Sequence, residues 1–158
     1  MTRKHEIRVA LADAVKTACA SKGLANSLPY FPRAIQDAEL PLSVVALRTG
    51  TFDWETYGAE QMVEDRTFEI LVHVARGTLG QEGVSEAECD DYGDLLIDYF
   101  GTHRVLRLTS GLEVFLTPTG DTGTTVFEYG DPRTRLFQFL GVTMPISVEI
   151  EKTFEQVN

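Results

Sequence analysis

The chain has 158 residues, 43% hydrophobic and 24% charged, which is the size and composition of one ordinary globular domain. A formal net charge of −10 argues against specific binding to nucleic acid, because a phosphate backbone would be repelled and the 14 Lys and Arg residues are scattered along the chain. No stretch is apolar enough for a membrane span and the first residues lack the apolar region of a secretory signal, so we expect no membrane contact and a cytoplasmic location.

The first predicted element is an amphipathic helix over residues 4–20. Apolar residues between Ile7 and Val15 recur at helical spacing, and Gly23 is placed to end the helix. The apolar stripe is rich in alanine, which suits close packing on a flat partner such as a sheet. Residues 28–34, LPYFPRA, hold two prolines around two aromatic residues and are predicted as an extended connector that packs on the domain.

Two strands are predicted next, over residues 42–47 and 67–76. The first is a short apolar run bounded by Pro41 and Gly50. In the second, apolar side chains occupy the even positions from 68 to 74 and alternate with more polar ones. This period of two is typical of a half-buried strand.

Between these strands, residues 49–65 are predicted as a long acidic loop. The segment reads TGTFDWETYGAEQMVED, and loops longer than about 12 to 15 residues are uncommon in compact domains unless they are functional or disordered. Its large apolar side chains either cap the core or contact another chain, since aromatic residues and Met are favoured at interfaces. We favour partner contact, and the candidate interface residues are Phe52, Asp53, Trp54, Glu55, Tyr57 and Met62.

A second helix is predicted from Ser85 to about Phe100. Ser85 and Glu88 have the spacing of a capping box, and Gly101 is placed to end the helix. Further strands are predicted over 105–108, 112–116, 124–129 and 135–154, with a bend or bulge where Gly141 and Pro145 interrupt the last one. The predicted fold class is α+β, a mixed, mostly antiparallel sheet with two main helices packed on one face.

Acidic residues and cysteines give no strong indication of chemistry. Asp90, Asp94 and Asp98 line one side of the second helix and could bind a hard cation, but a solvated helix face explains them more simply. Cys19 and Cys89 match no metal or redox spacing and are interpreted as buried apolar residues.

The histidines and a glycine-rich segment are likewise interpreted as structural. His5, His73 and His103 come from separate elements without a local metal-binding pair, which favours surface or capping positions. Residues 117–124, TPTGDTGT, lack the Gly-Lys-Ser/Thr of a phosphate loop and are predicted as a hairpin turn. We therefore expect no catalytic residues, no cofactor and no metal, and we do not expect an enzyme.

The order of predicted elements resembles the tail terminator proteins of long-tailed bacteriophages, the minor tail family that closes the tail tube. The likeness spans nearly the whole chain as a pattern and includes no diagnostic motif. The segments that carry it, after the Ala-rich first helix, are LSVVALRTG, the long loop, EDRTFEILVHVARG, EAECDDYGDLLIDYFGTH and FQFLGVTMPISVEIEKTFE.

The resemblance implies a homo-hexameric ring at the head-proximal end of the tail of the virion, assembled in the host cytoplasm. Such a ring stops polymerisation of the tail tube protein and presents a face to the head-tail connector protein. It also implies that a loop of the first strand hairpin, here residues 49–65, becomes ordered on assembly. DNA would pass through an acidic channel without specific binding, because the wall repels it.

Two other readings remain open. Head-completion or stopper proteins of the phage neck are also small, acidic and ring-forming. A small enzymatic or ligand-binding α+β domain would instead need a pocket with converging polar groups, which the linear sequence does not indicate.

Overall fold

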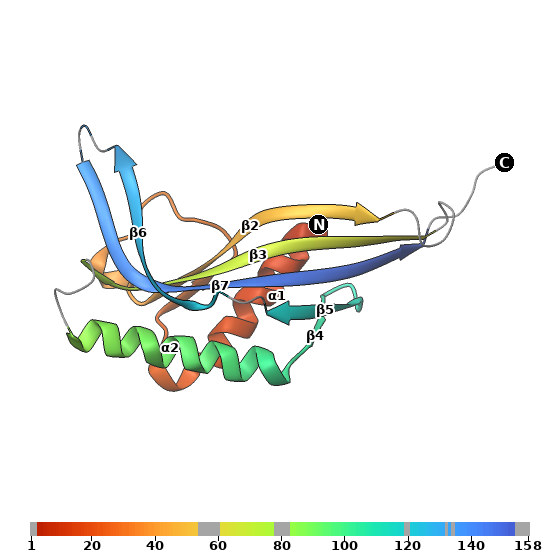
Figure 1. The fold of residues 1–158 in the computed structure, drawn as a ribbon, viewed down its shortest axis with the longest axis horizontal. Coiled ribbons are helices and arrows are strands. Elements are labelled where there is room, and N and C mark those ends of the chain that lie inside the picture. Colours follow the sequence, from red (N-terminus) through yellow and green to blue (C-terminus); the bar gives the residue numbers. More distant parts are fainter. Residues whose placement is uncertain are drawn as a thin grey trace.

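The computed structural model describes residues 3–53, 61–77, 83–118, 121–131, 133 and 135–153. Two long helices and a curled sheet form the molecule (Figure 1). The elements run in the order α1 (Arg3–Ala18), η1 (Ala20–Lys22), β1 (Asn26–Leu28), η2 (Asp37–Glu39), β2 (Leu42–Asp53), β3 (Gln61–Arg76), α2 (Gly83–Thr102), β4 (Val105–Arg107), β5 (Glu113–Pro118), β6 (Gly123–Asp131) and β7 (Arg135–Thr153).

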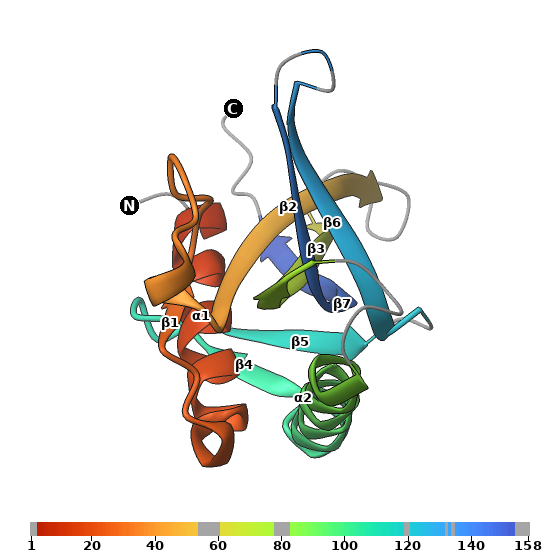
Figure 2. The same cartoon turned by 90° about the vertical axis from the view of Figure 1, so that its left-hand side faces the viewer.

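The strands form one mixed sheet in the order β1-β2-β3-β7-β5-β4, and β6 pairs with β7 as well. Among the described strands, β1 and β2 pair in parallel and the other ladders are antiparallel. Both helices lie on the same side of the curled sheet (Figure 2). The predicted α+β class, with a mostly antiparallel sheet and helices on one face, is confirmed.

The core lies between this helix-covered face and the two helices. Ile7 and Leu11 from α1, and Tyr92 and Leu96 from α2, are all at most 1% exposed and pack with the even-numbered residues of β3. The periodicities read from the sequence therefore identify the core-facing sides correctly. Both cysteines are also fully buried and free, as predicted, and burial raises the pKa of each thiol to about 11.

The predicted loop over residues 49–65 is wrong at both ends, because β2 and β3 form an extended hairpin. The two strands pair out to Asp53 opposite Val63, which leaves only residues 54–60 between them. On its other side, β3 pairs with β7 along this extension, with Gln61 opposite Thr153. Along this extension β3 therefore also forms main-chain hydrogen bonds with β7. Because β7 is distant in sequence, the composition of residues 49–65 does not indicate this second neighbour.

The limits of the second helix differ from the prediction. Helix α2 begins at Gly83, so Ser85 lies inside its first turn and is buried rather than acting as the N-cap. At the other end the helix continues through Gly101 to Thr102, whose Oγ1 donates to the Asp98 carbonyl at 3.1 Å. The predicted capping box and glycine terminator are therefore both misplaced by about one turn or less.

The predicted hairpin turn at residues 117–124 is also wrong. Strands β5 and β6 do not pair with each other, and both pair with β7, β5 up to Pro118 opposite Ile146 and β6 from Gly123 opposite Thr143. The segment between them therefore joins two successive strands along one edge of β7. Because β7 has 19 residues, it is long enough to accept both partners.

The bend in β7 lies at Gly141 and not at Pro145. The register of β3 and β7 shifts between His73 and Ala75, next to Gly141, whereas Pro145 pairs with Glu69 without interruption. A Cβ atom on Gly141 would overlap the Val72 carbonyl oxygen and lie 2.6 Å from Phe127 Cε2. Only glycine allows this close approach of β7 to β3 and β6.

Candidate functional site: an aromatic pocket on the outer face

A second, smaller cluster lies on the outer face of the sheet, the face that the helices do not cover. We call it the aromatic cluster, and it consists of Phe31, His73, Phe127, Tyr129 and Phe139. The His73 ring lies within 6.5 Å of the other four rings, measured between centroids. Residues from the connector between β1 and β2, which spans 29–41, and from β3, β6 and β7 thus meet at one place.

His73 is fully buried at the centre of the aromatic cluster. Its Nδ1 lies 3.2 Å from the Leu42 carbonyl oxygen and its Nε2 lies 2.6 Å from the Tyr129 hydroxyl oxygen. Because a carbonyl oxygen can only accept, Nδ1 must donate, and Nε2 then accepts the Tyr129 hydroxyl proton. Both ring nitrogens are satisfied in the neutral form, and burial lowers the pKa of His73 below its ordinary value.

The prediction of a surface or capping position is wrong for His73. The strand alternates as expected, but the connector and the β6–β7 hairpin cover its second face, so Leu71 is buried as well. Tyr129 shares this environment, and burial followed by the charge of Glu69 raises its pKa to about 12.

A cavity of about 300 Å³ opens beside the aromatic cluster, and we call it the aromatic pocket. Its walls are mainly apolar, and Arg33 is the charged residue among those that line it. The lining residues are Phe31, Pro32, Arg33, Ala34, Ile35, Tyr129, Gly130, Phe137 and Phe139. A neighbouring cavity of about 310 Å³ is more polar and is lined in part by Glu69, Glu128 and Thr143.

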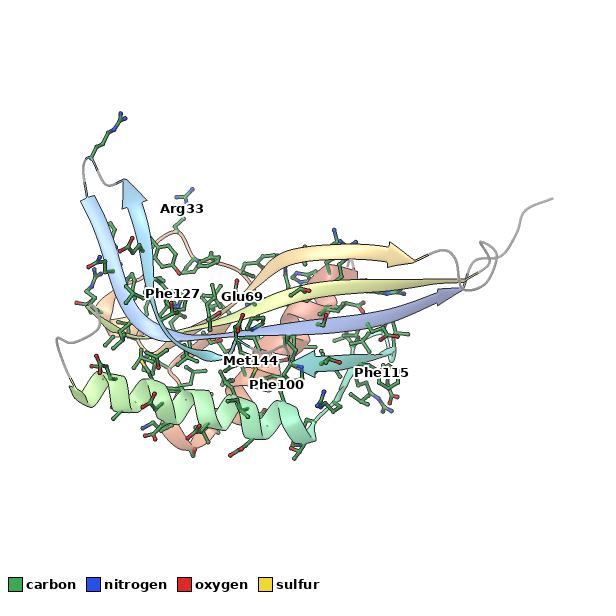
Figure 3. The ribbon with its side chains drawn as sticks, viewed as in Figure 1. Arg33, Glu69, Phe100, Phe115, Phe127 and Met144 are labelled. Carbon is green, nitrogen blue, oxygen red and sulfur yellow. The ribbon has the colours of Figure 1, made fainter. Side chains whose placement is uncertain are left out.

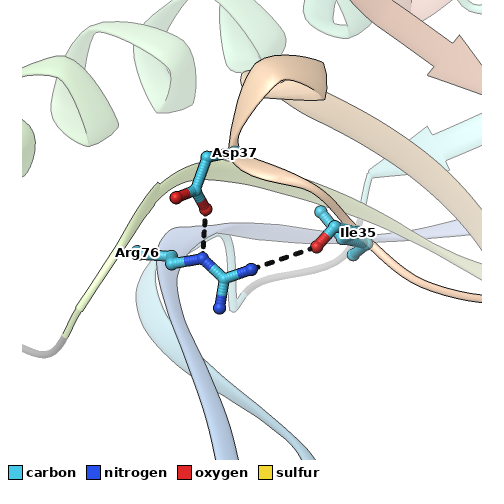
Figure 4. Close-up of polar contacts among 3 residues, drawn as sticks. All are labelled: Ile35, Asp37 and Arg76. Atoms are coloured by element: carbon cyan, nitrogen blue, oxygen red, sulfur yellow. Dashed lines mark hydrogen bonds and ion pairs between the residues drawn. The ribbon is translucent and has the colours of Figure 1, made fainter.

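Two arginines hold the connector that forms one wall of the aromatic pocket. Arg8 donates to the Val45 carbonyl at 2.7 Å and to the Pro29 carbonyl at 3.2 Å, and its guanidinium carbon lies 4.6 Å from the centre of the Tyr30 ring. Arg76 fixes the other end of the connector (Figure 4). The wall is therefore tied both to α1 and to the sheet.

The contacts of Arg76 also reach the opposite wall of the pocket. Its guanidinium pairs with Asp37 and donates to the Ile35 carbonyl at 3.3 Å. The same group lies 5.5 Å from the Phe137 ring centre and 5.1 Å from the Phe139 ring centre, within cation–π range. One side chain thus connects the connector to the β6–β7 hairpin across the pocket.

The outer face also carries an exposed apolar pair at its other end. Phe115 in β5 is 61% exposed and lies opposite Val105 in β4, which is 48% exposed. On its other side Phe115 lies opposite Glu149 of β7, which is exposed too. We call these three residues the Phe115 patch.

The remaining predicted residues have structural roles. His103 stacks on Tyr99 at 4.0 Å between ring centres, and its Nδ1 lies 2.9 Å from the Tyr99 carbonyl oxygen at the end of α2, so the predicted capping position is confirmed. His5 lies near the start of α1, where its Nδ1 is 2.8 Å from the Tyr30 hydroxyl. The side chains of Asp90, Asp94 and Asp98 are exposed, which agrees with a solvated helix face.

The structure describes only part of the predicted partner interface. Trp54, Glu55 and Tyr57 lie outside the described residues. Phe52, Asp53 and Met62 lie in the β2–β3 hairpin, for which the backbone alone is described. Their proposed role stays a prediction.

Within the described ranges, no three His, Cys, Asp or Glu side chains are placed to hold a metal ion. In the same part of the chain, no helix is both long and apolar enough to cross a membrane. The sequence matches no protein-family model and no curated protein. The aromatic pocket was not predicted from the sequence, although the aromatic pair in LPYFPRA and the alternating aromatics near residues 127–129 and 137–139 are signals that could have indicated it.

Proposed function

We propose that this chain is a structural assembly protein that forms a ring of six subunits, closes the head-proximal end of a phage tail tube and joins it to the head. The main support is that, within the described residues, the sheet has unpaired strand edges on both sides. Among the described strands, β1 covers only Leu42–Val44 of β2, so residues 46–53 have no partner on that side. At the other side of the sheet, β4 pairs only with β5.

Open strand edges are sites where another chain can add, and soluble proteins usually cover or disrupt them. Two different edges on one subunit favour contact between unlike surfaces of neighbouring copies. Such heterologous contacts repeat from subunit to subunit and close into a ring when the rotation allows it. This arrangement supports a ring better than a two-fold dimer.

Strands also project beyond the helix-covered body in two directions. The β2–β3 hairpin, together with the end of β7, extends to one side, and the β6–β7 hairpin rises at the other end (Figure 1). In the proposed ring, these projections would contact the tail tube protein on one side and the head-tail connector on the other. The formal charge of −10 on each subunit would let DNA pass the ring without binding it tightly.

Neck stopper proteins also form rings, so a ring does not by itself distinguish a tail terminator from a neck stopper. A small-ligand-binding domain is the second candidate, and the aromatic pocket favours it. Its volume of about 300 Å³ is at the lower end of the range for ligand pockets, roughly 300 to 1,000 Å³. A ligand-binding domain would have no use for open edges at both sides of the sheet, and we therefore prefer the ring.

Native mass spectrometry of the purified protein tests the ring directly. We expect a species with the mass of six 17.6 kDa subunits, in equilibrium with the monomer as the protein is diluted. A protein that stays monomeric at all concentrations, and that also fails to assemble on tail tubes, would contradict the proposed function.

A further inference from the structure

We propose that neighbouring subunits join by inserting Phe115 of one copy into the aromatic pocket of the next. This inference rests on the ring proposed above and identifies the contact that builds it. The occupant of the aromatic pocket is thus a second copy of this chain. Glu149 beside Phe115 of one copy pairs with Arg33 beside the pocket of the next.

Phe115 has the form of an interface anchor. Single exposed apolar residues are ordinary, but Phe115, at 61% the most exposed large apolar side chain among the described residues, lies opposite a second one, Val105. Val105 belongs to the edge strand β4, which has no further described partner, and Phe115 belongs to the adjacent strand β5. Large aromatic side chains of this kind dominate the binding energy of protein interfaces when a pocket on the partner receives them.

The aromatic pocket has the right size and lining for such a side chain. A cavity of roughly 150 Å³ lined by apolar residues is enough to bind benzene, and this one is about twice that volume. The phenyl ring of Phe115 would therefore fit together with part of Val105. Phe31, Tyr129 and Phe139 offer it the stacked and edge-on contacts that aromatic rings prefer.

The pocket is also held open before any partner arrives. Arg76 contacts Asp37 and Ile35 of the connector. Its guanidinium also lies over the rings of Phe137 and Phe139 on the other side of the pocket. Binding to a preformed pocket avoids the entropy cost of ordering its walls. Assembly therefore does not need to rearrange this part of the subunit.

Charges beside the two surfaces are complementary. Arg33 lines the pocket, is exposed, and has no ion pair or hydrogen bond to any other described residue. Glu149 lies opposite Phe115 in the next strand and is exposed, again without a polar partner among the described residues. Docking of Phe115 would bring a free carboxylate toward a free guanidinium, which sets the register of the contact.

The two surfaces lie far apart on one subunit, as the contact requires. Figure 3 shows Arg33 pointing away from the body on the side of the β6–β7 hairpin, and Phe115 on the other side of the body, beside β4 and β5. Phe115 therefore cannot enter the aromatic pocket of its own subunit. It can enter only the pocket of another copy, in the head-to-tail manner that generates rings.

Variants of the three residues test this contact in the purified full-length protein by analytical ultracentrifugation. Phe115→Ala should weaken association by about 30-fold, on the scale of a truncated interface anchor. Arg33→Glu and Glu149→Arg should each weaken it, and the double variant Arg33→Glu/Glu149→Arg should recover association close to the wild type. Asp94→Arg, a charge change of the same size as Glu149→Arg on the exposed side of α2, is the matched control and should not weaken association.

Recovery in Arg33→Glu/Glu149→Arg, with no recovery in Arg33→Glu/Asp94→Arg, which has the same net charge, would establish the pairing, because only the first double variant restores an opposite-charge pair at the contact. Association that is unchanged in Phe115→Ala, or a first double variant as weak as the sum of its parts, would overturn the contact, as would a wild type that never associates. A small molecule that copurifies in the pocket and is seen in the native mass would do the same. Head-to-tail association without capping of tail tubes would leave this contact standing and remove the proposed function instead.

Discussion

His73 lies at the centre of the aromatic cluster, although its position in an alternating strand suggests contact with solvent. The reason is that Phe31, Phe127 and Phe139, all distant in sequence, cover its ring. The Tyr129 hydroxyl and the Leu42 carbonyl then satisfy both nitrogens of the neutral imidazole. At the residue scale, the cluster thus depends on a histidine that stays uncharged.

This dependence predicts a loss of stability in mild acid. The folded protein holds the pKa of His73 below the ordinary value of 6.5, so the unfolded chain takes up the proton first as the pH falls. The contribution of neutral His73 is complete above that value and is lost as the pH drops through it toward the lower pKa of the folded state. The thermal unfolding midpoint should therefore fall between about pH 7 and pH 5.5, a window above the usual carboxylate range.

His73→Gln removes the titrating group and is the variant that checks this account. It should be less stable than the wild type at neutral pH, because glutamine cannot reproduce both ring contacts and the aromatic packing. Its unfolding midpoint should nevertheless change less over the same pH range. An equal pH dependence in the variant and the wild type would show that other groups cause it.

At the scale of elements, the shape of the sheet depends on the bend in β7 at Gly141. The bend sends the first half of β7 upward with β6 and lets the second half pair with β5. The aromatic pocket lies on the inner side of this bend, between the β6–β7 hairpin and the connector. A change at Gly141 should therefore disturb the pocket as well as the sheet.

Gly141→Ala should destabilise the protein by about 1 to 3 kcal/mol, the usual cost of inserting an atom into a filled site. The new Cβ would meet backbone of Val72 and the ring of Phe127, and the backbone cannot move aside without breaking the β3–β7 pairing. Urea unfolding followed by circular dichroism measures the change. Gly101→Ala is the matched control, since nothing lies within 4 Å of its Cβ and alanine favours the helix, so that variant should be as stable or more stable.

Local patterns in the sequence predict the elements far better than they predict how those elements pair. The helical stripes around Leu11 and Tyr92 and the alternation in β3 follow from neighbouring residues alone, and all are confirmed. The full length of the β2–β3 hairpin and the shared edge of β5 and β6 depend on β7, which comes last in the chain. The aromatic pocket was missed for the same reason, since its walls come from segments about 100 residues apart.

At the scale of the whole molecule, the subunit combines an acidic surface, open sheet edges and projecting hairpins. The net charge of −10 disfavours a protein that grips DNA, and it also opposes association between copies. Specific contacts must therefore offset the repulsion in a ring. The Phe115 patch and the aromatic pocket provide an apolar contact and an opposite-charge pair for that purpose.

Negative-stain imaging of purified protein mixed with assembled tail tubes tests the central claim most directly. We predict six-fold rings at one end of each tube and tubes that stop growing at that end, with Trp54→Asp protein remaining folded but capping fewer tubes. Tubes that keep both ends bare and continue to grow in an excess of the wild-type protein would contradict the account.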